Sequence, residues 1–183
     1  MTLKSSFNLR NKKFYYFIIL LIFSILFNQY YGFKGVFPED SFLTFNSGYD
    51  TLNGKYPFKD FYTTTGPLLD FIQALFFKIF GVSWFSYVLH ASVFNFILAI
   101  ATFQVLTKFN LNLNYCFFYS LLVSILAYPS SGTPFMDHHS TFISTIAIFS
   151  FILAIKTKSN YYWFAIPFIL GFAFLSKQVP ASY

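Results

Sequence analysis

Five runs of the sequence carry no charged side chain and are each long or nearly long enough to cross a lipid bilayer. A helix needs about 20 mostly apolar residues to cross a hydrocarbon core about 30 Å thick. The five runs are Phe14–Phe33, Val82–Thr107, Phe109–Tyr128, Ser140–Ile155 and Ser159–Ser176. The sequence therefore predicts an all-α, polytopic membrane protein with about five transmembrane helices in one transmembrane domain over residues 1–183.

The composition agrees with this class. Of the residues, 56% are hydrophobic and only 10% are charged, whereas a soluble domain carries about 25% charged residues. Such a chain is neither a typical water-soluble globule nor intrinsically disordered, because disorder requires low hydrophobicity and high charge. The single cysteine, Cys116, excludes an internal disulfide framework and a Cys-x-x-Cys metal site. The net charge of +6 indicates membrane orientation rather than nucleic-acid binding.

Basic residues near the ends of the spans predict the orientation. Lys4, Arg10, Lys12 and Lys13 precede the first run, so we place the N-terminus in the cytoplasm and treat this run as a retained span. All six acidic residues then fall on the external side: Glu39, Asp40, Asp50, Asp60, Asp70 and Asp137. Insertion does not require this asymmetry, because acidic residues contribute little to topology. We therefore expect polar chemistry at the outer face.

The segment 34–81 between the first two spans is predicted to be an external loop that contains an interfacial helix. Ser41–Leu52 interleaves apolar and polar residues and predicts a short helix on the membrane surface. Pro67 suits a first helical turn, and the apolar segment Leu68–Phe80 follows it. These 14 residues (67–80) are too short to span a bilayer. Gly81 is a natural stop, so we expect a helix that lies at the outer surface.

Two external segments carry candidate catalytic or metal-binding groups. A carboxylate of Glu39 or Asp40 can act as a general base toward an acceptor hydroxyl, although an acidic pair can also be a solvated loop start. Asp137 and the two histidines that follow it can supply ligands to a divalent cation, with two of the three as the more plausible count. Alternatively, Asp137 caps a helix that begins near Ser140.

Other polar residues have a structural interpretation as well as a functional one. Lys177, with Gln178 just after the fifth run, can bind the phosphate of a lipid head group or snorkel at the end of a span. His90 lies inside the second run, where polar side chains are functional candidates. We expect His90 and Asn95 to form hydrogen bonds with neighbouring helices. Cys116 is expected to be a small buried apolar group.

The loop sequence resembles a known family. After the acidic pair comes Gly48–Phe61, which reads GYDTLNGKYPFKDF, and then Gly66-Pro67-Leu68. This pattern is similar to that of type C membrane glycosyltransferases of the protein O-mannosyltransferase and aminoarabinose transferase group, glycosyltransferase family 39-like. The later segment GFAFLSK, which ends at Lys177, is similar to a Gly-x-x-x-Leu-x-Lys pattern in the same group.

The resemblance implies an enzyme that moves a sugar from a polyprenyl-phosphate carrier to a lipid, protein or glycan acceptor at the external face, with no nucleic-acid partner. It implies the inner (cell) membrane of a bacterium. The catalytic acid of the family falls on Asp40, with Glu39 as its neighbour or substitute, because the usual order of the pair is Asp-Glu. Some members use a divalent metal, and the corresponding ligands are Asp137 and His138. Aminoarabinose transferases tend to have a lysine where this chain has Thr65, so Lys59 or Lys177 is expected to replace it at the carrier phosphate. We predict substrate binding by Lys59, Asp60, Lys177 and Gln178.

Members of the family are longer than this chain, so we expect an N-terminal fragment of a transferase. Three other functions remain open from the sequence. A transporter or flippase shares the apolar spans, but no span contains an acidic residue, lysine or arginine. A non-catalytic membrane subunit would use the aromatic loop to bind a partner. A polysaccharide polymerase would share the lipid-linked substrate class without the acidic pair.

Overall fold

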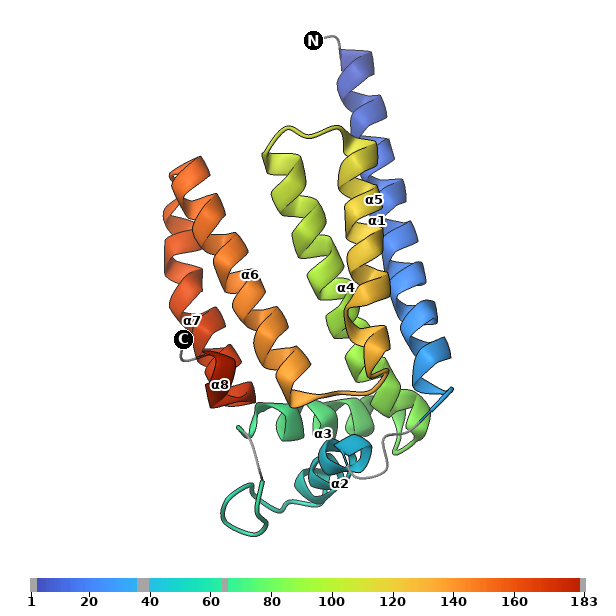
Figure 1. Ribbon diagram of the computed structural model, residues 1–183, viewed down its shortest axis with the longest axis vertical. Coiled ribbons are helices and arrows are strands. Elements are labelled where there is room, and N and C mark those ends of the chain that lie inside the picture. Colours follow the sequence, from blue (N-terminus) through green and yellow to red (C-terminus); the bar gives the residue numbers. More distant parts are fainter. Residues whose placement is uncertain (1–2, 36–39, 64–65, 182–183) are drawn as a thin grey trace.

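The computed structural model describes residues 3–35, 40–63 and 66–181, and within these ranges the chain is helical with no named β-strand. Five long helices run up and down beside one another (Figure 1). They are α1 (Leu3–Gly32), α4 (Trp84–Lys108), α5 (Leu113–Leu126), α6 (Met136–Thr157) and α7 (Asn160–Ser176). The shorter elements are α2 (Asp40–Leu52), α3 (Leu68–Phe80), the 3₁₀ turn η1 (Tyr128–Ser130) and α8 (Gln178–Ala181).

Four segments are long and apolar enough to cross a membrane. They are Asn11–Gly32, Trp84–Lys108, Leu113–Ser130 and Met136–Thr157. The fifth predicted run forms α7, an apolar helix of 17 residues that is about 26 Å long at 1.5 Å per residue. The predicted all-α polytopic class is confirmed, with four candidate spans and one shorter apolar helix.

Two helix starts differ from the predicted boundaries. Asn110 has a φ of 59°, and the side chain of Asn112 accepts a hydrogen bond from Asn114 N at 2.9 Å, so α5 begins only at Leu113. Helix α6 begins at Met136, four residues before the predicted start, and Phe135 precedes it without a side-chain cap. The expectation that Asp137 caps this helix is therefore wrong, because Asp137 lies inside its first turn.

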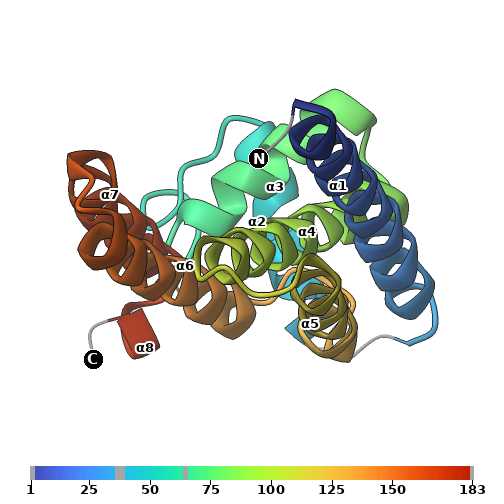
Figure 2. The same ribbon diagram turned by 90° about the horizontal axis from the view of Figure 1, so that it is seen from above.

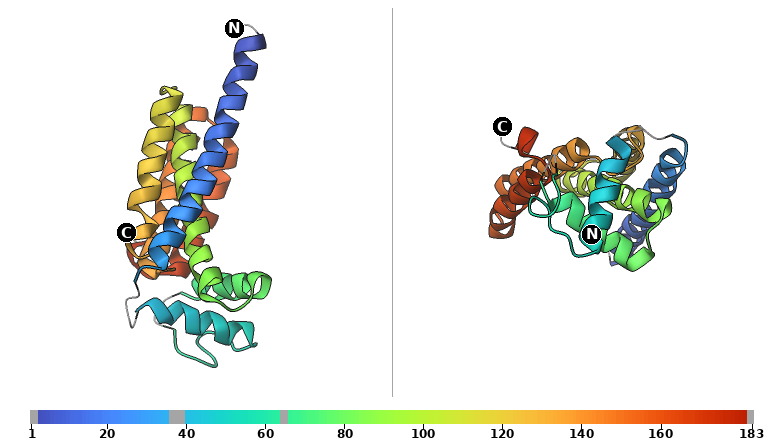
Figure 3. Two further views of the ribbon diagram at one scale, coloured as in Figure 1. Left: turned by 90° about the vertical axis from the view of Figure 1, so that its right-hand side faces the viewer. Right: turned by 90° about the horizontal axis from the view of Figure 1, so that it is seen from below.

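Helices α2 and α3 lie across one end of the bundle (Figures 1 and 3), and both predicted loop helices are confirmed. Gly81 ends α3 as predicted, with a φ of 81° and its N–H donating to Phe77 O at 2.9 Å. Gly48 brings α2 close to α3, because a Cβ at this position would lie 2.6 Å from Gln73 Cγ. We call this end of the molecule the α3 end.

The long helices form two groups, which Figure 2 shows from above. Helices α1, α4 and α5 pack together, and Tyr16 of α1 stacks on Phe117 of α5 with ring centroids 4.3 Å apart. Helices α6 and α7 form a pair beside them. The predicted interhelical role of Asn95 is confirmed, because its Nδ2 donates to Ser124 O at 2.9 Å. Cys116 is buried in this core, as expected.

A close contact between two glycines fixes the loop after η1. Gly132 has a φ of 71°, and a Cβ on it would lie 2.6 Å from Gly32 Cα. Asn28 Nδ2 donates to Gly132 O at 3.2 Å, and Trp84 Nε1 donates to Gly32 O at 2.9 Å. The loop that leads into α6 is thus held against the ends of α1 and α4.

Candidate functional site

The acidic residues that the structure describes all belong to elements at the α3 end (Figure 1). Asp40 and Asp50 belong to α2, Asp60 to the following loop, Asp70 to α3 and Asp137 to the first turn of α6. The sequence predicted that these residues share one face, and the fold brings their elements to one end of the bundle. Glu39, the other member of the predicted catalytic pair, lies outside the described residues.

A pocket of about 250 Å³ at this end joins two of the predicted site residues. Its lining includes several hydroxyl groups and comes from the start of α2, from η1 and the loop after it, and from the start of α6: Asp40, Ser41, Ser130, Ser131, Thr133, Phe135 and His138. The predicted base Asp40 and the predicted metal ligand His138 therefore meet at one cavity. A carboxylate, an imidazole and several hydroxyls are groups that can hydrogen-bond a sugar.

The two predicted site residues of the pocket have different surroundings. Asp40 is exposed in the first turn of α2, where the positive end of the helix dipole stabilises a carboxylate. On the opposite wall, His138 Nε2 lies 3.0 Å from Ser130 Oγ. The His138 ring stacks on Tyr128, with centroids 5.3 Å apart and an interplanar angle of 27°. The carboxylate is thus exposed to solvent, while the imidazole is held in place.

Asp137 and Lys177 form an ion pair, which the sequence did not predict. Lys177 Nζ lies 2.5 Å from Asp137 Oδ1, and the two side chains are 32% and 46% exposed. Ser140 Oγ of α6 also donates to Lys177 O at 3.0 Å, so the end of α7 is held against the start of α6. Gln178 follows at the start of α8 and is exposed.

The predicted metal ligands contact different partners. Asp137 pairs with Lys177, whereas His138 contacts Ser130. Among the described residues, no group of three or more His, Cys, Asp or Glu side chains is arranged to hold a metal ion. A divalent-cation site at Asp137 and His138 stays a prediction.

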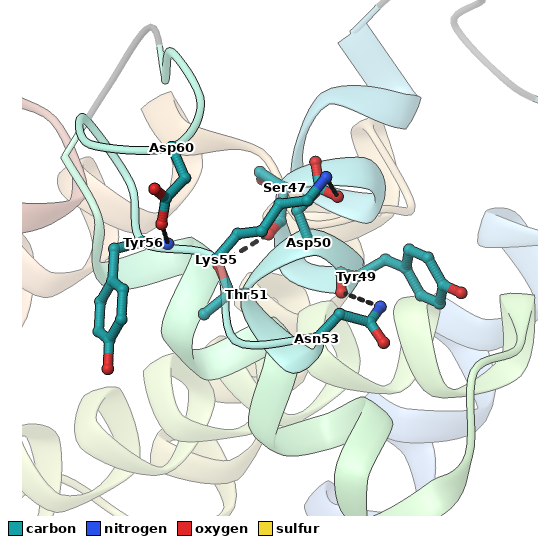
Figure 4. Close-up of polar contacts among 8 residues, drawn as sticks. All are labelled: Ser47, Tyr49, Asp50, Thr51, Asn53, Lys55, Tyr56 and Asp60. Carbon is teal, nitrogen blue, oxygen red and sulfur yellow. Dashed lines mark hydrogen bonds and ion pairs between the residues drawn. The ribbon is translucent and has the colours of Figure 1, made fainter.

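Lys59 and Asp60 lie on the turn after α2 and do not line the pocket. Figure 4 shows that the carboxylate of Asp60 turns back to its own loop, where Oδ2 accepts the N–H of Tyr56 at 2.8 Å. Lys59 Nζ lies 5.6 Å from the centroid of the Tyr56 ring. These residues of the family-like motif therefore shape the loop, and their substrate-binding role stays a prediction.

The same loop is tied to α2 by an ion pair. Lys55 Nζ lies 2.8 Å from Asp50 Oδ1, and this contact raises the pKa of Lys55 (Figure 4). The contact joins the turn to the last part of α2, at the opposite end of that helix from Asp40. It thus anchors the motif loop without involving the pocket.

Asp70 is a buried carboxylate that the sequence indicated only as a partner of the helix dipole. It is 3% exposed, and its Oδ1 accepts a hydrogen bond from Ser47 Oγ at 2.5 Å. Burial raises the pKa of Asp70 from its ordinary value of 3.8, and hydrogen bonds from Ser47 and Thr63 oppose this rise. Asp70 thus joins α3 to α2, although its burial destabilises the charged form of its carboxyl group.

Replacing Asp70 by asparagine is expected to stabilise the protein at pH 7. Because the pKa of Asp70 is higher in the folded protein, protonation of its carboxyl group favours folding. This contribution to the free energy of unfolding is complete below pH 3.8, the ordinary pKa, and is lost as the pH rises through the folded-state pKa. Each unit of that rise corresponds to about 1.4 kcal/mol at neutral pH. Thermal unfolding in detergent from pH 3 to pH 8 measures the effect, and the advantage of Asp70→Asn should disappear at the acid end.

Asp50→Asn is the matched control, because Asp50 is in a partly exposed ion pair. Its effect on stability should stay within about 1 kcal/mol. A lower stability of Asp70→Asn than of the wild type at pH 7 would contradict the role assigned to burial.

The hydroxyl groups of the pocket were not identified from the sequence. Ser130, Ser131 and Thr133 lie in the short connection PSSGTPF, which was noted only for the acidic residue and histidines that follow it. The available signal was this cluster of small hydroxyl residues between two apolar runs. Gln73 and Tyr128, which are both completely buried, gave no signal beyond their polarity.

Comparison with known proteins agrees with the architecture. The family profile described as dolichyl-phosphate-mannose-protein mannosyltransferase matches residues 64–182. The matched range includes α3, the pocket residues from Ser130 to His138, and Lys177, whereas α2 with Asp40 precedes it. No curated protein and no solved structure matches the chain significantly. Because the profile covers more than half of the sequence, the chain belongs to the dolichyl-phosphate-mannose-protein mannosyltransferase family of membrane glycosyltransferases.

Proposed function

We propose that the protein transfers a sugar from a polyprenyl-phosphate carrier to a hydroxyl acceptor at the external face of the membrane, with Asp40 as the general base. The observation that carries the proposal is the pocket at the α3 end. There, the carboxylate-bearing start of α2 meets the hydroxyl and imidazole groups of Ser130, Ser131 and His138. These groups can hydrogen-bond the hydroxyl groups of a sugar and of its acceptor.

The reaction needs one proton acceptor and one departing phosphate. The acceptor hydroxyl gives its proton to the Asp40 carboxylate while its oxygen forms a bond to C1 of the sugar. The bond between C1 and the phosphate oxygen breaks, and the polyprenyl phosphate leaves with the electron pair. The proton then passes from Asp40 to solvent, to which this residue is exposed.

The position of α3 suits a substrate with a lipid tail. Three apolar side chains along this helix are exposed at four-residue spacing: Phe71 (47%), Leu75 (53%) and Ile79 (62%). Residues four apart lie on the same side of a helix, so the stripe can rest in the interfacial region of the membrane. A carrier anchored in the bilayer would then present its phosphate close to the level of the pocket.

Lys177 is the residue that we propose to meet the carrier phosphate, with Gln178 beside it. Its ammonium group is partly exposed at the α3 end and is paired with Asp137. A phosphate can replace a partly exposed carboxylate at little cost, because such ion pairs contribute only about 0–1 kcal/mol. Lys59 and Asp60, on the outer turn, remain candidate acceptor contacts.

A divalent cation at Asp137 and His138 is a separate proposal. These two residues would have to exchange their present partners, Lys177 and Ser130, for the ion. When bound, such a cation would supply positive charge for the departing phosphate. Transfer that survives a chelator would remove the need for this ion.

We also propose that the N-terminus is cytoplasmic and that the α3 end is external, as in a bacterial inner membrane. An Asn53→Cys variant in a Cys116→Ser background tests this orientation. Asn53 is exposed on the loop after α2, so a membrane-impermeant maleimide should label it in intact cells. Labelling only after permeabilisation would reverse the orientation.

The activity itself is tested with a polyprenyl-phosphate-linked [³H]mannose probe in membranes that contain the protein. Transfer predicts that labelled mannose leaves the carrier in proportion to the amount of protein and that free polyprenyl phosphate is formed. A flippase predicts that the intact probe changes leaflet without release of the sugar. A non-catalytic subunit predicts neither change, and either of these results would contradict the proposal for this donor class.

A further inference from the structure

Four completely buried polar side chains form a continuous row at the α3 end. Gln73 comes from α3, His90 from α4, His139 from α6 and Tyr128 from η1, and each is 0% exposed. We call these four residues the polar layer. The row confirms that His90 forms hydrogen bonds with neighbouring helices, because its partners Gln73 and His139 belong to α3 and α6. Tyr128 extends the network to η1.

The hydrogen bonds of the polar layer run in one direction. His90 Nδ1 lies 2.9 Å from Gln73 Oε1, which can only accept, so His90 Nδ1 carries the hydrogen. His90 Nε2 is then the acceptor for His139 Nε2–H at 3.0 Å. His139 Nδ1 in turn accepts from the hydroxyl of Tyr128, which it contacts directly. Two neutral imidazoles with opposite tautomers satisfy the three contacts along the row, whereas Gln73 Nε2 is buried without a hydrogen-bond partner among the described residues.

One end of the polar layer supports the α2 wall of the pocket. A Cβ at Gly48 would lie 2.6 Å from Gln73 Cγ and 2.7 Å from Gln73 Cβ. The Gln73 side chain is therefore part of the surface on which α2 rests, and α2 begins with Asp40. The position of this side chain is fixed by its hydrogen bond to His90.

The other end supports the opposite wall. Tyr128 O accepts hydrogen bonds from Ser131 N at 3.0 Å and from Gly132 N at 2.9 Å. The Tyr128 ring stacks on His138, and both Ser131 and His138 line the pocket. The Tyr128 hydroxyl also accepts a hydrogen bond from the N–H of Phe135 at 3.3 Å, so the same group joins the polar layer to another residue of the pocket wall.

Aromatic rings cover the polar layer on its sides. Phe76 stacks on His90 with centroids 5.1 Å apart, and Phe94 lies 4.2 Å from His139. Buried polar groups cost free energy unless they are hydrogen-bonded, and their directional bonds can fix the register of the elements that carry them. An apolar contact would allow α3, α4 and α6 to slide, whereas this row permits one arrangement.

We propose that the polar layer is a positioning network that holds the two walls of the sugar-transfer pocket in register, so that Gln73 and Tyr128 act on Asp40 and His138 as one unit. This inference rests on the proposed function for its catalytic consequence. Its structural part, the coupling of the two walls, can be measured without any substrate.

The first test is a double-mutant cycle on the accessibility of the pocket. In a Ser131→Cys variant on a Cys116→Ser background, the rate of maleimide labelling at position 131 measures how accessible this wall of the pocket is. Gln73→Met keeps the contact with Gly48 but removes the acceptor, and Tyr128→Phe removes only the hydroxyl. Each change should alter the labelling rate at least about twofold, and the double variant should change it no more than one single variant does.

Tyr16→Phe is the matched control. It also removes one tyrosine hydroxyl that bonds a second helix, because Tyr16 Oη donates to Asn114 Oδ1 at 2.7 Å. This bond lies toward the other end of the bundle, away from the α3 end (Figure 1). It should leave the labelling rate unchanged and should add independently to Gln73→Met. Additive effects of Gln73→Met and Tyr128→Phe, or an equal effect of Tyr16→Phe, would overturn the proposal.

A spectroscopic readout follows the hydrogen-bond row directly. In ¹⁵N-histidine spectra of the wild type in detergent, His90 should be the Nδ1–H tautomer and His139 the Nε2–H tautomer. Tyr128→Phe should allow the His139 tautomer to change, whereas Tyr16→Phe should not. Identical spectra for the wild type and Tyr128→Phe would contradict the row.

Kinetics then separate this inference from the proposed function. With the polyprenyl-phosphate mannose probe, Gln73→Met should lower kcat about 10- to 100-fold with little change in KM. If the wild type does not transfer mannose, the proposed function fails for this donor, while the labelling cycle and the tautomers still decide the coupling. If the wild type is active and Gln73→Met keeps its full kcat, the positioning role fails and the proposed function stands.

Discussion

Replacing Asp40 by asparagine is expected to reduce sugar transfer by about 10²- to 10⁴-fold, which is the usual contribution of a general base. Asparagine keeps the size of the side chain and can still lie at the start of α2, but its amide cannot take the acceptor proton. Asp40 is exposed, so the substitution should not disturb packing. Mannose release from the polyprenyl-phosphate probe measures the rate, and expression level and thermal unfolding report the fold.

Two companion variants make this result specific. Asp50→Asn removes a carboxylate from the other end of the same helix, where it pairs with Lys55, and it should keep nearly full activity. Glu39→Gln asks which member of the acidic pair acts, and it should lose less activity than Asp40→Asn. Full activity of Asp40→Asn together with an inactive Glu39→Gln would assign the base to Glu39 and contradict our choice.

The spans could be predicted because an uncharged apolar run has few alternatives to crossing the membrane as a helix. The surface helices were also predictable, since Pro67 and Gly81 mark the limits of α3. The exact starts of α5 and α6 were harder to predict from the sequence. They depend on a left-handed Asn110 and on an early first turn at Met136, and neither feature changes the hydrophobic pattern.

The site was predictable only in pieces. Asp40 and His138 were each candidates on their chemistry, but the sequence does not reveal that they line one pocket. Their meeting depends on the contact between Gly32 and Gly132, which lie far apart in the chain. Asp60 illustrates the opposite case, because its carboxylate bonds the Tyr56 N–H of its own loop. A short motif cannot distinguish a substrate contact from such a local turn.

The other large effect is expected from Gly66→Ala, which should destabilise the protein by about 3 kcal/mol or more, at or above the upper end of the usual cost of overpacking. A Cβ on Gly66 would lie 1.8 Å from Leu175 O and 2.3 Å from Leu175 C. Both are backbone atoms, so no change of rotamer can relieve the overlap. The end of the loop must therefore move away from α7 and lose the bond from Gly66 N to Ser176 O, now 3.2 Å.

Gly171→Ala is the matched control on α7 itself. A Cβ on Gly171 meets nothing within 4 Å, and alanine is favoured over glycine inside a helix by about 0.5–1 kcal/mol. This variant should be as stable as the wild type or slightly more stable. Thermal unfolding of both variants in the same detergent measures the difference.

The functional consequence of Gly66→Ala follows from its position between two parts of the site. Leu68, two residues later, begins α3, whose Gln73 supports α2, and Ser176 precedes Lys177 at the ion pair with Asp137. A displaced Gly66 should therefore lower sugar transfer even at temperatures where the protein remains folded. If Gly66→Ala unfolds at the same temperature as Gly171→Ala and transfers mannose equally well, then the loop does not rest on α7 in the folded protein.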